Sequence, residues 1–375
     1  MKTAITILVF CVAALLALGM VMLYSSSMVQ VGAHYLMLQF VWGALGLAGC
    51  FVAMLMDYRQ LKKIAWPLFG IAVLLLVLVL IPHVGVRVNG AKRWLRYGGF
   101  TLQPSEFAKV ALIIALARYG ENHLRQMTSW KRGILIPGLF IGCVLGLIFL
   151  EPDVGNALLL AAVSSVILLT AGIRLKYFLP PVVAAALAVG IFIYNNPMRS
   201  GRVYSWLHVE ETKREKGLQA YQGMVAFGAG GWAGLGLGNG RQKLGFVPEH
   251  HTDFIFPMIG EELGVIATVF VVSAFIAIII CGIFIAMRAH DTFGLLLATG
   301  LTFLIGLQAF INIAVVTGVL PNKGLPLPFI SYGGSNLLMM LVCVGILLSV
   351  ARRARIPEPV NPNPFAEELP EAQAS

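Results

Sequence analysis

Long apolar stretches recur along this chain, and each has the length of a membrane-crossing helix. The hydrocarbon core of a bilayer is about 30 Å thick, which roughly 20 apolar residues cross as an α-helix. Backbone polar groups find no water in lipid, so the sequence predicts an all-α integral membrane protein with about ten transmembrane helices. The stretches lie near residues 5–24, 35–56, 65–82, 104–118, 134–150, 154–172, 178–195, 255–287, 294–317 and 328–350.

Composition excludes the soluble alternatives. Hydrophobic residues make up 58% of the 375 residues and charged residues only 12%, which is outside the range of soluble domains. The net charge of +10 comes from basic residues in loops between the apolar stretches, where they orient a membrane protein, so we expect no nucleic-acid binding. All five cysteines lie inside apolar stretches, so neither a disulfide nor a zinc site is expected.

The lysine and arginine residues predict that both termini are cytoplasmic. In that orientation a large extracytoplasmic loop, about residues 196–254, joins spans seven and eight of one polytopic domain, residues 1–352. The first stretch is expected to be an uncleaved span, and residues 353–375 a disordered cytoplasmic tail. One short outer loop opposes the usual charge bias, which indicates an anionic ligand. Its basic residues are Arg87, Lys92, Arg93 and Arg96.

An acidic segment, residues 248–264, joins the large loop to the eighth span. Carboxylates at a membrane edge are costly, so they mark functional sites by default. A partly desolvated carboxylate near a substrate hydroxyl can act as a general base, and Asp253 is the catalytic candidate. The alternative is that Thr252 or Asp253 only caps the following helix. The other ionisable residues here are Glu249, His250, His251, Glu261 and Glu262.

A second polar cluster stands at the fourth stretch, where Pro104 suits the first turn of a helix. Glu106 and Lys109 are three residues apart and share one helix face. Two interpretations stay open: an ion pair that joins helices, or the wall of a polar cavity that positions a substrate. Upstream, Arg93 offers a cation for a phosphate, and Trp94 an aromatic ring for the membrane interface.

Glu151 and Asp153 lie in the short turn between the fifth and sixth stretches. They could bind a divalent cation, Mg²⁺ or Mn²⁺, and the simpler interpretation is a solvated turn. No organic cofactor is expected, because the glycine-rich residues 228–240 lack the spacing and context of a dinucleotide fold. Those glycines would allow close approach to a glycan or lipid headgroup, a buried re-entrant segment, or simple flexibility.

Prolines and glycines interrupt residues 321–335, just before the last span. Irregular backbone at membrane depth is tolerated where it lines a cavity, so this segment is a candidate wall of the site. A structural kink is the alternative.

Together these motifs resemble the SEDS family (shape, elongation, division and sporulation) of membrane peptidoglycan glycosyltransferases, with its FtsW, RodA and SpoVE branches. The resemblance covers nearly all of residues 1–352 and rests on residues 92–95, 103–109, 248–264 and 324–335. Residues 259–264 and 322–326 are more similar to the FtsW division branch than to RodA. The chain departs from the family pattern at Asn156, where threonine is usual, at Pro257 and at Asn336.

The resemblance implies polymerisation of lipid II at the outer face of the bacterial cytoplasmic (inner) membrane, at the division septum, with release of undecaprenyl diphosphate. Asp253 would be the general base on the 4-hydroxyl of the incoming lipid II. The implied partners are lipid II, the nascent glycan, a class B penicillin-binding protein and other division-complex membrane proteins. The implied substrate contacts are Arg93, Trp94, Glu106, Lys109, Gln222, Glu249, His251, Lys323 and Ser331.

A lipid II flippase is the alternative from another class, and a RodA-type elongation polymerase is the alternative within the family. A flippase needs polar groups through the full membrane depth, whereas here they cluster toward the predicted outer face, which favours the enzyme. A non-catalytic scaffold is the third alternative, and it would make Asp253 dispensable.

Overall fold

The computed structural model describes residues 1–27, 34–82, 84–88, 91–97, 100–212, 217–241 and 252–354. A long helix occupies each of the predicted positions, which confirms the helical fold class. These helices are α1 Lys2–Ser27, α2 His34–Leu55, α3 Tyr58–Leu80, α4 Pro104–Asn122, α5 Ile136–Leu150, α6 Val154–Thr170, α7 Leu175–Tyr194, α10 Ile255–Met287, α11 Thr292–Val316 and α12 Gly334–Arg352.

Eight helices in the described ranges are long and apolar enough to cross a membrane. The other two are α6, which has 17 residues, and α4, which carries Glu106 and Lys109. Most residues of α4 are buried within the bundle. A helix surrounded by protein needs no apolar surface, which explains the weaker hydropathy of α4. A total of ten spans stays a prediction.

Local signals set several helix boundaries. The helix α4 begins at Pro104, as predicted, and α10 has its predicted bounds. By contrast, α3 begins well before the predicted residue 65, because the Asp57 side chain accepts the Arg59 N–H and caps the helix. The helix α12 begins only at Gly334, because the backbone before it stays irregular.

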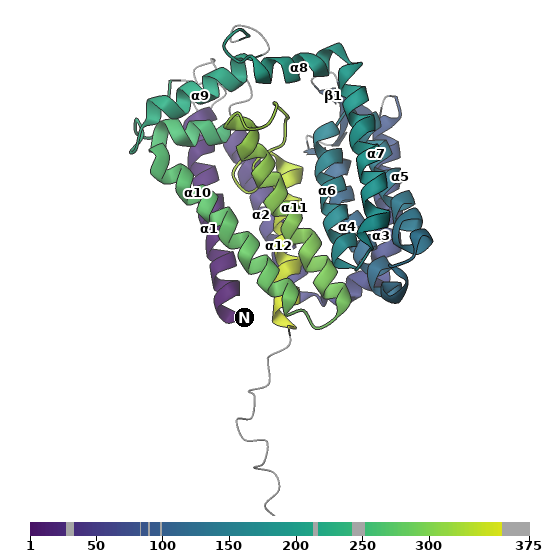
Figure 1. Ribbon diagram of the computed structural model, residues 1–375. Helices are drawn as coiled ribbons and strands as arrows, with labels where there is room; N and C mark the ends of the chain where they lie inside the picture. Colours follow the sequence, from purple (N-terminus) through teal and green to yellow (C-terminus); the bar gives the residue numbers. More distant parts are fainter. Residues whose placement is uncertain are drawn as a thin grey trace, which may run out of the picture.

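The connections at one end of the bundle contain elements that the sequence did not predict. An antiparallel sheet has the order β1-β2-β3, and the large loop contains two helices. Figure 1 shows α8, α9 and β1 at the end of the bundle opposite the N-terminus. The bounds are β1 Gly85–Val88, β2 Ala91–Tyr97, β3 Phe100–Leu102, α8 Pro197–Leu207 and α9 Leu218–Gly230. At the opposite end, a 3₁₀-helix, Leu124–Gln126, and a π-helix, Lys131–Leu135, join α4 to α5.

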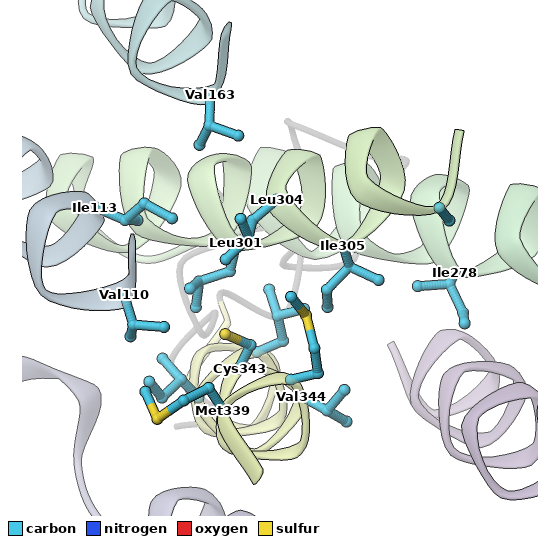
Figure 2. Close-up of a cluster of buried hydrophobic side chains, with 14 of the residues drawn as sticks. Val110, Ile113, Val163, Ile278, Leu301, Leu304, Ile305, Met339, Cys343 and Val344 are labelled. Atoms are coloured by element: carbon cyan, nitrogen blue, oxygen red, sulfur yellow. The ribbon is translucent and has the colours of Figure 1, made fainter. Parts of the chain in front are cut away.

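The helix α11 lies in the interior of the bundle. Leu301, Leu304 and Ile305 of α11 pack among apolar side chains from α4, α6, α10 and α12 (Figure 2). Within the most apolar 18-residue window, 72% of α11 and 83% of α12 is buried, against 0% of α7. The helices α11 and α12 are therefore interior, as α4 is, whereas α7 lies at the edge.

Candidate functional site

Asp253 lies in the turn that leads from the large loop into α10. The N-cap position is occupied by Phe254, which makes no side-chain cap hydrogen bond, so neither Thr252 nor Asp253 is the N-cap residue. Asp253 is partly buried. Its backbone carbonyl accepts a hydrogen bond from Nδ2 of Asn312 at 2.9 Å. Its carboxylate faces Gly324, since a Cβ atom on that glycine would lie 2.5 Å from Oδ2 of Asp253.

The irregular residues 321–333, here called the proline segment, are held by two amides one turn apart on α11. Nδ2 of Asn312 donates to the Leu325 carbonyl at 2.6 Å, and Nε2 of Gln308 donates to the Pro326 carbonyl at 3.0 Å. Both amides are at most 1% exposed. Prolines prevent a helical path here, so these carbonyls need donors from elsewhere in the bundle. The proline segment therefore lies beside Asp253, as a wall of the site would.

Glu106 and Lys109 form a buried ion pair, 2.9 Å apart and each 1% exposed. Nζ of Lys109 also donates to Gln308 at 3.0 Å and to Asn156 at 3.3 Å. Asn336 donates to Glu106 at 2.8 Å. The pair thus joins α4, α6, α11 and α12, which supports the ion-pair interpretation. Two of the departures from the family pattern, Asn156 and Asn336, are partners of this pair. Contact with a substrate stays a prediction.

Arg93 on β2 ties the sheet to the turn between α5 and α6. Its Nε donates to the Glu151 carbonyl at 3.0 Å, and one terminal nitrogen donates to the Pro152 carbonyl at 2.7 Å. The other terminal nitrogen is 3.7 Å from Asp153. Asp153 in turn caps α6 through the backbone N–H and side-chain amide of Asn156. The guanidinium is thus occupied by protein groups, and its contact with a substrate phosphate stays a prediction.

The expectation of a solvated turn at Glu151 is wrong, because this side chain is 0% exposed. Within the described ranges, neither carboxyl oxygen has a hydrogen-bond partner. Burial, and then the neighbouring Asp153, raise the pKa of Glu151 to about 8, and Arg93 lowers it in part. Glu151 is therefore mostly protonated at neutral pH.

The predicted divalent-cation ligands, Glu151 and Asp153, do not form a cation site of three or more ligands. No group of three or more His, Cys, Asp or Glu side chains that could hold a metal occurs in the part of the chain that the structure describes. Both oxygens of Asp153 accept hydrogen bonds from Asn156. These residues do not fit a divalent cation in this arrangement, and a metal requirement stays a prediction.

The remaining predicted contacts lie in several places. Lys323 is in the proline segment, directly before Gly324, and burial lowers its pKa. Ser331 is 4% exposed, and its hydroxyl accepts the Leu327 N–H at 2.8 Å. Trp94 is partly buried on β2, and Gln222 is partly buried on α9. Glu249 and His251 lie outside the described residues.

The glycine-rich residues 230–240, here called the glycine strap, pack against a break in α10. The break is at Gly264, whose φ of 75° and ψ of −172° are not helical. The N–H groups of Leu235 and Gly236 donate to the two carbonyls that the break exposes, at 2.9 and 3.0 Å. A Cβ atom on Gly234 would overlap one of these carbonyls. The strap contacts α10 on one side, but eight of its eleven residues are exposed, so the alternative of a segment buried in protein is wrong.

The side chains of Glu261 and Glu262 also hold the end of the strap. Both are 1% exposed. Glu262 accepts from the Ser25 hydroxyl of α1 at 2.6 Å and from the Gly238 N–H at 3.0 Å, and Glu261 accepts from the Arg241 N–H at 2.8 Å. These carboxylates join α1, α10 and the strap.

Sequence reasoning missed Gln308 and Asn312, the side chains that hold the site together. They are four residues apart inside an apolar stretch, so they share one face of the helix. Amides at that spacing in a predicted span indicate a polar contact between helices, and this was the signal that could have identified them.

Comparison with known proteins gives one consistent family. Residues 6–356 match the family model of FtsW, RodA and SpoVE, described as "Cell cycle protein". A "Probable peptidoglycan glycosyltransferase FtsW" from Trichlorobacter lovleyi is 42% identical over 351 residues, which is 92% of each chain. A relative of the same name from Geobacter metallireducens is 41% identical over 348 residues, 91% of this chain and 93% of its own.

Solved structures share the fold. A chain from the work "Structural coordination of polymerization and crosslinking by a peptidoglycan synthase complex" matches with a TM-score of 0.78 and 31% identity, over 92% of this chain and 96% of its own. The rod shape determining protein RodA of Thermus thermophilus matches with a TM-score of 0.71 and 29% identity, over 93% and 97%. The motifs, the helical bundle and these matches agree, and this chain belongs to the SEDS family of FtsW, RodA and SpoVE.

Proposed function

We propose that this chain is a peptidoglycan glycosyltransferase that polymerises lipid II at the outer face of the bacterial cytoplasmic membrane. The observation that carries the proposal is the place of Asp253, partly buried at the end of the bundle with its carboxylate against the proline segment. Relatives about 40% identical over most of the chain are named FtsW, which supports the enzyme class and a septal role in division.

The reaction transfers a glycosyl group from a diphosphate to a hydroxyl group. The 4-hydroxyl oxygen of the incoming lipid II forms a bond to the anomeric carbon of the growing strand. The bond from that carbon to the diphosphate oxygen breaks, and undecaprenyl diphosphate leaves with the electron pair. Asp253 accepts the hydroxyl proton, which is the work of a general base. Lys323, in the segment that faces Asp253, is a nearby candidate cation for the departing charge.

The decisive experiment is lipid II polymerisation by purified protein with its transpeptidase partner. Asp253→Asn keeps the shape of the side chain and removes the base, so we expect polymer formation to fall by about 100-fold or more. Asp291→Asn is the matched control, because Asp291 caps α11 and asparagine caps equally well. Polymerisation by Asp253→Asn within twofold of the wild-type rate would contradict the assignment, and transbilayer movement of lipid II without polymer would favour the flippase.

A chelator arm of the same assay tests the predicted divalent cation. Such an ion would stabilise charge on the leaving diphosphate. We expect activity to fall with the chelator and to return with Mg²⁺ or Mn²⁺. Full activity in the chelator would contradict a metal requirement.

A class B penicillin-binding protein is the proposed partner, with lipid II, the nascent glycan and other division proteins. A structural relative that comes from a peptidoglycan synthase complex supports this. Both termini are proposed to be cytoplasmic, since the N-terminus and the end of α12 lie at the same end of the bundle (Figure 1). Cysteine labelling of intact cells at the chain ends and at α8 tests this orientation.

A further inference from the structure

Two residues that take no part in the proposed reaction contact Asp253, one at its backbone carbonyl and one at its carboxylate. We propose that Asn312 and Gly324 are positioning residues, which together set the place of the Asp253 carboxylate relative to the proline segment. The inference rests on the proposed function, in which Asp253 is the general base.

Asn312 fixes the backbone of Asp253. One amide nitrogen donates to two carbonyls from distant parts of the chain, Asp253 at 2.9 Å and Leu325 at 2.6 Å. The opposite orientation of the amide would place its oxygen against two carbonyl oxygens, so the orientation is determined. Asn312 is 1% exposed and projects from α11 in the interior of the bundle. A rigid helix thus sets the separation between Asp253 and the proline segment.

Gly324 leaves the space that the Asp253 carboxylate occupies. A Cβ atom there would lie 2.5 Å from Oδ2 and 3.6 Å from Cγ of Asp253, and no other described residue, its two chain neighbours aside, has an atom within 4 Å. The φ angle of Gly324 lies outside the positive range, so alanine fits the backbone. An added methyl group therefore meets a single obstacle, the carboxylate itself. Glycine at this position lets the carboxylate lie against the segment.

The two contacts set the same distance, that between Asp253 and the backbone at Gly324. Leu325, whose carbonyl Asn312 binds, directly follows Gly324. The next carbonyl, that of Pro326, is bound by Gln308 one turn earlier on α11. The amides therefore hold the Gly324 backbone at a fixed distance from Asp253, and the missing side chain of Gly324 makes that distance possible.

The test uses the full-length protein with its transpeptidase partner and lipid II as the probe. Gly324→Ala should lower kcat by about 10- to 100-fold, because a small displacement of a catalytic group has an effect of that size. KM for lipid II should stay within about twofold, and the pH dependence of kcat should change, because the base has moved. Thermal stability should be nearly unchanged. Gly146→Ala, where a Cβ atom meets nothing within 4 Å, is the matched control and should behave as wild type.

Asn312→Leu has a similar volume and no donors. It should also lower kcat more than KM, together with a lower melting temperature, because two buried carbonyls lose their donor. In the Asp253→Asn background, Gly324→Ala should cause no further loss, since both changes act through one carboxylate.

Three results would overturn the proposal. They are wild-type kcat and pH profile in Gly324→Ala, a further tenfold loss on adding Gly324→Ala to Asp253→Asn, or losses of activity that only follow losses of folded protein in both single variants. Retained activity of Asp253→Asn alone would instead overturn the proposed function, so the two failures are distinguishable.

Discussion

The glycine strap and the proline segment find partners for their backbone polar groups in different ways. Both place irregular backbone against helices of the bundle, where each N–H and C=O group needs a partner. In the strap most of the partners are backbone groups of α10, exposed by the break at Gly264, and the Glu262 carboxylate adds one side-chain partner at Gly238. In the proline segment they are side chains, the amides of Gln308 and Asn312 and the Ser331 hydroxyl.

The difference determines what each region tolerates. Backbone can approach backbone in the strap only because glycines leave room, so an added atom is the damaging change. The proline segment depends on donors that project from α11, so for stability a lost side chain is the damaging change. The segment that faces Asp253 is the one held by side chains, whose length and chemistry can be altered one residue at a time.

The largest effect should come from Lys109→Met, which removes the cation that binds Gln308, the residue that donates to the Pro326 carbonyl. Glu106 is left as a buried charge, and Gln308 loses the donor that orients it. Breaking a buried pair from one side costs about 3–5 kcal/mol. Thermal unfolding in detergent measures the loss.

The double variant Lys109→Met with Glu106→Gln, which leaves no isolated charge, is the control and should recover part of that stability. A single variant as stable as the wild type would show that the pair does not join the helices.

The next largest effect should come from Gly234→Ala in the strap. Gly234 has a φ of 79°, and a Cβ atom would overlap the Glu262 carbonyl. Strain and overpacking together should cost about 2–4 kcal/mol. Gly228→Ala in the neighbouring helix α9 meets nothing within 4 Å, and it should raise stability by up to about 1 kcal/mol.

Equal thermal stability of these two alanine variants would contradict close backbone packing as the reason for the glycines.

The smallest effect concerns Glu151, whose carboxyl oxygens have no hydrogen-bond partner within the described residues. Its folded pKa is about 8 against an ordinary 4.5. As pH rises through this window the unfolded state loses a proton and the folded state does not, so stability falls. Glu151→Gln should remove that decline, worth about 1–2 kcal/mol between pH 5 and about pH 6.5. Unfolding midpoints across this range measure it, and parallel curves for the two proteins would contradict a buried neutral acid.

Hydrophobic patterning predicted the positions of the long helices, and Pro104 predicted the start of α4. The acid before an apolar stretch identified Asp253 as the candidate. Hydropathy alone does not give the number of membrane-spanning helices, because the mostly buried α4 is less apolar than a helix that faces lipid.

Other features depend on contacts between distant residues. Glu151 reads as solvated until the structure shows its side chain fully buried, in a turn to which Arg93 is hydrogen-bonded. The glycine strap reads as flexible until the break in α10 supplies its partners. The double contact of Asn312 joins Asp253 and Leu325, a pairing that local sequence does not encode.

The position of Asn312 on a regular helix also limits how this chain can vary in length. The helix α11 starts at a cap formed by Asp291, which accepts the Tyr58 hydroxyl at the end of the bundle away from Asp253. One residue inserted between that cap and Asn312 would turn the amide by about 100° around the helix axis. Insertions and deletions among relatives should therefore be absent from α11 and accumulate in the connecting loops.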